Sequence, residues 1–234
     1  MVAKHRAQVI VVDYVPSAFY CPAMFEFGVP VILITLNREA EFYNDQLKHG
    51  LMVNGRPGTR VAGHRIRRVE RSLYRKSAAV VAIGKYDVPK PFLFKRSRYF
   101  VVPPILDPKP QAQSWTFSNT RSLFFVGRIG HYPNKEAIDW LATKLSPILA
   151  KLDSEITIKI VGASASEVPL DWRHDNIRFL GVSNRFDVDM LFRTEDLFIA
   201  PILNNYGAKL KVAEAMAYGT PFLASEGALS GVLE

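Results

Sequence analysis

The chain has 234 residues, of which 48% are hydrophobic, and this length suffices for one large domain or two small ones. A formal net charge of +8 biases the surface towards phosphates, anionic lipid or nucleic acid without choosing among them. A single cysteine, Cys21, excludes an intrachain disulfide and a cysteine-rich metal cluster, and fits a reducing, cytosolic setting.

Four short apolar runs in the first hundred residues predict strands. They span residues 8–13, 30–35, 79–84 and 98–103. The runs are continuous rather than alternating, which is typical of strands buried on both faces of a parallel sheet. The first run is too short for a secretory signal. The sequence contains no run of about 18 apolar residues, so no membrane-spanning helix is predicted.

The segment 56–76 is strongly basic and contains one acid, Glu70. Ile66, Val69 and Leu73 recur in it at helical spacing, which predicts an amphipathic helix with one buried apolar stripe and a basic face. That face is either solvated, with the helix packed on a sheet, or it adheres to an anionic membrane surface. Nucleic-acid binding is disfavoured, because no aromatic residues are interleaved to stack bases.

A second series of apolar runs predicts strands at 122–127, 156–162, 176–181, 197–201 and 221–225. A helix is predicted from residue 134 to 152. Its apolar side is expected to comprise Ala137, Trp140, Leu141, Leu145 and Ile148. Strands that alternate with helices predict an α/β fold with parallel sheets and right-handed crossovers.

The stretch 105–120 is rich in proline, serine and glutamine and has the composition of a linker. The sequence therefore predicts an N-terminal Rossmann-like domain over 1–104 and a second one over 121–234.

The most informative stretch is AKLKVAEAMAYGTPFLAS, residues 208–225. It predicts a helix over 208–218 that ends at Gly219, and a strand that begins at Pro221. In open α/β sheets, ligands bind beyond the carboxyl ends of strands, and a helix N-terminus there favours phosphate. Lys209 and Lys211 add positive charge. Glu214 could accept two hydrogen bonds from a ribose diol, or form an ion pair with Lys211.

This stretch resembles the group 1 glycosyltransferases of the GT-B fold. The matching string is K-V-x-E-A-M-A-x-G-x-P, and it covers residues 211–221. Upstream, FFVGRIGHYPNKEAIDWL resembles the first strand and helix of the family's C-terminal domain, and IKIVG resembles its second strand. The three pieces come in the family's order, and the resemblance covers roughly residues 121–231.

The resemblance implies a donor site for a nucleoside-diphosphate sugar, with no metal and no further cofactor. Arg128 and Lys135 match the family's basic pair, which binds the diphosphate and stabilises the charge that builds up as it leaves. The alternatives are a solvated loop cation for Arg128 and a helix cap for Lys135. Glu214 matches the family's ribose-binding glutamate. The remaining binding residues implied are Gly127, Asn205, Tyr206, Gly207, Lys209 and Lys211.

The sequence also departs from the family. Tyr206 stands where relatives often have a second glutamate that touches the donor sugar. The candidates to replace that contact are Asn204, Asn205 and Tyr206 itself. Leu36 stands where relatives have a histidine in a His-Asn-x-Glu string, of which only Asn37 and Glu39 are present. His64 and His131 are further histidines, for which a structural role is expected.

A GT-B enzyme has two complete Rossmann-like domains and a longer chain, so this sequence resembles an enzyme truncated at both ends, with an incomplete N-terminal domain. The resemblance implies transfer of a sugar to a glycan or lipid-linked acceptor, in the cytoplasm or at the inner face of the membrane. The alternative is a non-catalytic nucleotide-sugar-binding protein or membrane-surface adaptor. A dinucleotide enzyme and a P-loop kinase are disfavoured, because neither G-x-G-x-x-G nor G-x-x-x-x-G-K-[ST] occurs.

Overall fold

The computed structural model describes residues 6–19, 22–50, 52–53, 56–88, 98–107, 121–195 and 197–232. Most of the predicted linker, 108–120, lies outside these residues. Contacts between Cα atoms divide the chain into two compact units. Unit 1 comprises Met1–Pro104, Tyr206–Ala208 and Leu233–Glu234, and unit 2 comprises Ile105–Asn205 and Lys209–Val232.

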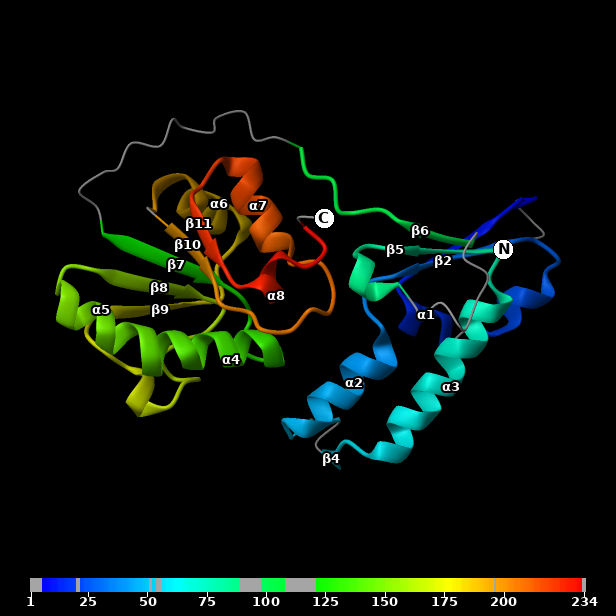
Figure 1. The fold of residues 1–234 in the computed structure, drawn as a ribbon, viewed down its shortest axis with the longest axis horizontal. Helices are drawn as coiled ribbons and strands as arrows, with labels where there is room; N and C mark the ends of the chain where they lie inside the picture. Colours follow the sequence, from blue (N-terminus) through cyan, green and yellow to red (C-terminus); the bar gives the residue numbers. More distant parts are fainter. Residues whose placement is uncertain are drawn as a thin grey trace. The chain divides into compact units, whose positions relative to one another are not determined.

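Unit 1 is built on a parallel four-stranded sheet with the order β1-β2-β5-β6. Its strands are β1 (Ile10–Asp13), β2 (Val31–Thr35), β5 (Ala79–Ala82) and β6 (Tyr99–Val101), and all four were predicted. The helices lie on one side of this sheet (Figure 1). They are α1 (Val15–Phe19), α2 (Glu39–Lys48) and α3 (Arg60–Lys76), with 3₁₀ turns at Pro22–Glu26 and Lys85–Asp87 and a hairpin of β3 (Met52–Val53) and β4 (Arg56–Pro57).

The two faces of the unit 1 sheet differ in burial. Leu33 and Val80 face the helices and pack with Leu73 and Tyr74 of α3. On the opposite face, Val11 is 56% exposed and Phe100 is 53% exposed. The prediction that these strands are buried on both faces is therefore wrong for the described part of unit 1, where only the helical side is fully covered.

Helix α3 begins later than the basic segment does, at Arg60, because the Thr59 side chain accepts a hydrogen bond from the Ala62 N–H at 3.2 Å and caps the helix. The predicted apolar stripe is partly wrong. Leu73 is buried, but Val69 is 40% exposed. The buried side is formed instead by Gly63, Glu70, Leu73 and Tyr74, which follow the helical repeat.

Glu70 is buried because its carboxylate caps another helix. Its two oxygens accept hydrogen bonds from the backbone N–H groups of Glu39 at 2.7 Å and Ala40 at 3.3 Å, which open α2. Tyr74 donates its hydroxyl to the same carboxylate at 2.9 Å. These bonds supply the cap that Arg38, at the N-cap position of α2, does not provide with its own side chain. The acid inside the basic helix thus joins α3 to α2.

Unit 2 holds a parallel five-stranded sheet with the order β11-β10-β7-β8-β9. The first strand in the chain, β7, lies at the centre, and the chain then builds outward on one side before crossing to the other. Its strands are β7 (Ser122–Val126), β8 (Thr157–Val161), β9 (Ile177–Gly181), β10 (Leu197–Ala200) and β11 (Phe222–Ala224), all of them predicted. This is the strand order of Rossmann-like folds.

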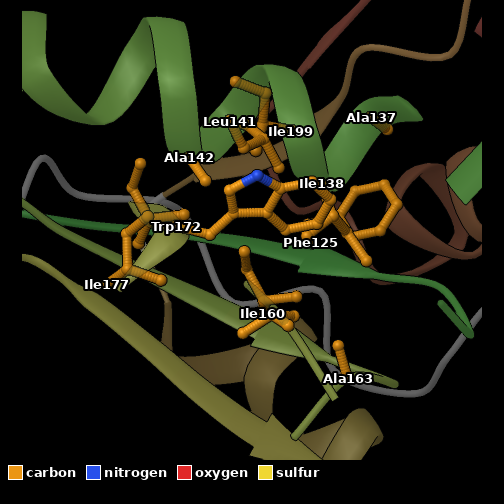
Figure 2. Packing of buried hydrophobic residues seen from close by; sticks show 12 residues of the cluster. Phe125, Ala137, Ile138, Leu141, Ala142, Ile160, Ala163, Trp172, Ile177 and Ile199 are labelled. Atoms are coloured by element: carbon orange, nitrogen blue, oxygen red, sulfur yellow. The ribbon is translucent and has the colours of Figure 1, made fainter. Parts of the chain in front are cut away.

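Each face of the unit 2 sheet packs on helices, because neighbouring residues of a strand point to opposite faces. Phe125 lies in the core under α4 (Tyr132–Trp140) and α5 (Ser146–Leu152), where Trp172, from a 3₁₀ turn at Leu170–Trp172, packs on Ile160 and Ile177 (Figure 2). Phe124 faces α6 (Arg185–Thr194) and α7 (Leu210–Tyr218). Both faces are therefore buried, as predicted. A short helix, α8 (Glu226–Leu229), follows β11.

The helix predicted over 134–152 is interrupted by a π-helical segment, Leu141–Leu145. Pro147, in the first turn of α5, has no N–H and its ring excludes the carbonyl four residues earlier, so the regular hydrogen-bond ladder cannot continue. The wider turn rotates the helix faces. Ile148, which follows the wider turn, is consequently 56% exposed. Trp140 precedes the wider turn and is 43% exposed. Both were wrongly placed on the apolar side, where Ile138 and Ala142 are buried instead.

Within the described residues, no helix is long and apolar enough to cross a bilayer.

Candidate functional site

The predicted site residues of unit 2 lie where the strand order of its sheet reverses. Strands β7 and β10 are neighbours, and Phe124 pairs with Phe198. From β7 the chain continues to β8 on one side, whereas β10 continues to β11 on the other. The loops after both strands leave from the same carboxyl edge, and this switch point is where open α/β sheets bind ligands.

Two glycines bring the loops after β7 and β8 close together. Gly162 has φ +100°, and a Cβ built on it would contact the Gly127 carbonyl oxygen and lie 2.8 Å from the Arg128 nitrogen. Gly127 donates its N–H to Val161 at 2.9 Å, and Ile129 donates to Gly162 at 2.9 Å. Gly127 therefore holds the loop in place, and Arg128 follows at its exposed end.

Arg128 and Lys135 are both exposed and belong to the same loop and first helical turn. The Arg128 carbonyl accepts hydrogen bonds from the Asn134 side chain and the His131 N–H, each at 3.0 Å. These bonds fix the backbone of the loop and leave the guanidinium on the surface. Its charge is felt by Glu167, whose pKa is lowered first by hydrogen bonds to Ser164 and also by Arg128.

The loop after β10 carries Asn205 and Lys209. Ser230 donates its hydroxyl to the Asn205 carbonyl at 3.0 Å. Lys209 donates to the Asn204 side chain at 3.3 Å. Gly227 in α8 packs so closely that an added Cβ would lie 2.6 Å from the Ile202 carbonyl oxygen. The segment after β11 thus supports the loop that was predicted to contact the ligand.

His131 and Lys209 show that the loops after β7 and β10 converge. Burial lowers the pKa of His131, and the positive charge of Lys209 lowers it further. Both effects favour the neutral imidazole, although His131 is exposed. Sequence reasoning expected only a structural role for this histidine. His64 is structural in α3, where its ring lies 2.9 Å from the Arg60 carbonyl oxygen.

Helix α7 begins at Leu210, two residues later than predicted, and ends as predicted at Gly219 with φ +68°. Glu214 is buried on this helix at 8% exposure. Lys211 lies 2.6 Å from one of its carboxylate oxygens, so the alternative ion pair exists, but it is not a surface pair. Arg185 of α6 lies 2.8 Å from the other oxygen. No pattern in the sequence predicted this contact, because Arg185 and Glu214 are 29 residues apart in the chain.

Tyr206 and Gly207 group with unit 1 rather than with the rest of the predicted set. Gly207 has φ +67°, a backbone conformation that favours glycine. In unit 2, the predicted residues fall in two segments: Gly127, Arg128 and Lys135 follow β7, whereas Asn205, Lys209, Lys211 and Glu214 follow β10, the strand beside β7. Within the described part of the chain, no cluster of three histidine, cysteine or acidic side chains is suited to hold a metal ion.

Glu39 is a buried acid at the carboxyl end of the unit 1 sheet. Its burial was not predicted from the sequence. Glu39 opens α2 and is 9% exposed, and its Oε1 has no hydrogen-bond partner within the described residues. Burial raises its pKa to about 7; a hydrogen bond to Asn37 opposes this, and the charges of Glu70 and Asp87 add to it. The carboxyl is therefore partly protonated at neutral pH.

Comparison with solved structures shows the fold. TarM is similar to 92% of the chain, with a TM-score of 0.64 and 14% sequence identity. Trehalose-6-phosphate synthase OtsA is similar to 97% of the chain, with a TM-score of 0.67 and 14% sequence identity. HepE from Anabaena, solved in complex with UDP and glucose, is similar to 96% of the chain, with a TM-score of 0.59 and 16% sequence identity. The chain spans 40% of the length of TarM and 60% of OtsA and HepE. No curated protein sequence matches the chain.

The family model described as "Glycosyl transferases group 1" matches residues 120–234. This range contains the whole unit 2 sheet and both loops that converge at its switch point. The two parallel α/β sheets are those of GT-B glycosyltransferases. Over residues 120–234, therefore, this chain is similar to the group 1 glycosyltransferases.

Proposed function

We propose that the chain is a glycosyltransferase that binds a nucleoside-diphosphate sugar on the carboxyl edge of unit 2 and transfers the sugar to a glycan or lipid-linked acceptor. The observation that carries the proposal is that the Arg128 loop after β7 and the Lys209 loop after β10 leave neighbouring strands at the switch point, where the charge of Lys209 acts on His131. The UDP in the HepE structure makes a uridine nucleotide the first candidate donor.

The proposed division of labour follows from charge and burial. Arg128 and Lys135 are exposed cations on the β7 side, placed to bind the diphosphate and to stabilise the negative charge that builds up as the sugar leaves. The first N–H groups of α7 have no partner inside the helix and can add to this. Glu214 is proposed to accept hydrogen bonds from the ribose. These side chains supply the charge stabilisation without a metal ion.

Calorimetric titration with UDP, GDP and their sugars tests donor binding. We expect at least one nucleoside diphosphate to bind, and Arg128→Ala to weaken it about tenfold through loss of a charge-assisted bond. The matched control is Arg121→Ala. Arg121 directly precedes β7 at the opposite edge of the sheet and pairs with Asp153 and Glu155. Absence of binding at millimolar nucleotide, or equal losses in both variants, would contradict the proposal.

A second candidate function, attachment to an anionic membrane surface, is favoured by the exposed side of α3. Its exposed residues include no acid, since Glu70 is buried against α2. Val61 is 62% exposed and Val69 40% exposed among the cations. The exposed basic residues of the helix are Arg60, His64, Arg65, Arg68, Arg71, Arg75 and Lys76. Cations with interspersed apolar side chains suit an anionic lipid headgroup layer.

Vesicle flotation tests this attachment. With vesicles containing one third phosphatidylserine, we expect the chain to float, and Arg65→Glu/Arg68→Glu to lower the bound fraction several-fold, because each basic residue adds about 1 kcal/mol near such a surface. Vesicles of phosphatidylcholine alone are the lipid control. Lys144→Glu/Lys151→Glu, on the helical segment of unit 2, is the protein control. Equal flotation on both lipids would show that the basic face does not drive attachment.

A further inference from the structure

Both oxygens of the Glu214 carboxylate are occupied by cations from different helices. Lys211 Nζ lies 2.6 Å from Oε2, one turn earlier on the same helix, and Arg185 Nη1 lies 2.8 Å from Oε1. Glu214 is buried at 8% exposure, whereas the side chains of Arg185 and Lys211 are 52% and 35% exposed. Two charge-assisted bonds on opposite oxygens restrict rotation of the carboxylate plane.

Arg185 is the better fixed of the two cations. Its Nε pairs with Asp189 at 2.8 Å while Nη1 contacts Glu214, so the planar guanidinium is held at two of its nitrogens. Asn184 accepts a hydrogen bond from the Asp187 N–H at 3.0 Å and caps α6, which sets the place where Arg185 enters the helix. Lys211, by contrast, holds Glu214 through a flexible chain of single bonds. The orientation of the carboxylate therefore depends mainly on Arg185.

A carboxylate has about four acceptor positions, two on each oxygen. Among the described residues, Arg185 and Lys211 use one on each, which leaves one acceptor position per oxygen. A ribose offers two adjacent hydroxyl donors, which match two oxygens of one carboxylate. We propose that Arg185 is a positioning residue that orients Glu214 to accept both ribose hydroxyls of the donor nucleotide. This inference rests on the proposed function and adds to it a residue outside the matching string.

The test compares the affinity of UDP with that of 2′-deoxy-UDP by calorimetric titration, and GDP with 2′-deoxy-GDP in parallel. The wild-type chain should bind the ribonucleotide about tenfold more tightly, because a hydrogen bond to a charged group is lost with the hydroxyl. Arg185→Ala should reduce this ratio to about twofold. Arg185→Lys keeps the charge without the planar fork and should give an intermediate ratio.

The matched control is Arg193→Ala. Arg193 is also on α6 and contacts α7, through the Tyr218 ring at 5.2 Å, but it is not a partner of Glu214. This variant should keep the tenfold ratio. A tenfold ratio in both Arg185 variants, or an equal fall in Arg193→Ala, would overturn the inference while the proposed function stands. If the wild-type chain binds neither UDP nor GDP, the proposed function itself fails, and the positioning role with it.

Discussion

Replacing Gly162 by alanine is expected to lower the free energy of unfolding of unit 2 by about 4 kcal/mol. Two costs add. Gly162 has φ +100°, which an L-residue adopts only with strain, and its new methyl group would lie 2.6 Å from the Gly127 carbonyl carbon. The Gly127 carbonyl group and the Arg128 nitrogen, which the methyl group would meet, are backbone atoms of a short hydrogen-bonded loop. They cannot move away without breaking the hydrogen bonds of that loop.

Two other glycines separate these costs. Gly181 has φ +69° but its nearest neighbour is the Ser164 side chain at 3.9 Å, so Gly181→Ala carries the backbone strain alone, about 1 kcal/mol. Gly130 has neither a positive φ nor an atom within 4 Å, and Gly130→Ala should be nearly neutral. Chemical denaturation followed by Trp172 fluorescence reports unit 2, since Trp172 is buried in its core. Equal stability of the Gly162 and Gly130 variants would refute the close packing of the loops.

Unit 1 is expected to lose about 3 kcal/mol of stability between pH 5 and pH 8 through Glu39. The pKa of this carboxyl is raised from 4.5 to about 7 in the folded chain. The folded state therefore binds the proton more tightly than the unfolded state does. The stabilisation is complete below about pH 4.5 and is lost as the pH rises through 7, because the buried group must then ionise without a partner on Oε1.

Glu39→Gln removes this titration and should flatten that part of the pH profile, so that the variant is the more stable form at pH 8 and not at pH 5. Glu41→Gln is the control, because it removes a carboxylate from the same turn, where Glu41 pairs with Arg38 at 2.9 Å and is partly exposed. Unit 1 has no tryptophan up to residue 104, so denaturation is followed by circular dichroism, with hydrogen exchange in α2 and α3 to assign the transition. Parallel profiles for wild type and Glu39→Gln would show that the carboxyl ionises freely.

The strands could be predicted from sequence because each is a short apolar run, as in SLFFVG and ITIKIVG, and such a run can be recognised without knowledge of its partner strand. The end of α7 could also be predicted, because Gly219 readily adopts the left-handed conformation that ends a helix. Arg128 and Glu214 came from a string of neighbouring residues. Such features are local in the chain, and local physics specifies them.

The features that were missed depend on distant partners. In the sequence, Glu70 is a single acid in a basic helix. Its burial could not be predicted, because it depends on hydrogen bonds from the N–H groups of α2. One error has a local cause instead, because the wide turn before Pro147 changes the helical repeat and displaces Ile148. Arg185 gains its partners Asp189 and Glu214 only when α6 packs beside α7. Periodicity on one segment carries no information on any of these contacts.

The position of β7 at the centre of its sheet has a consequence for the order of folding. β7 can pair with β8 early, but its other neighbour, β10, comes after β9 and α6 have been synthesised. Closing such a long loop is entropically costly, which delays non-local strand pairing. The segments that carry Arg128 and Glu214 are therefore expected to become neighbours late in folding. A ligand held by both loops would bind the completed sheet and not its precursors, and so draw the folding equilibrium towards the native state.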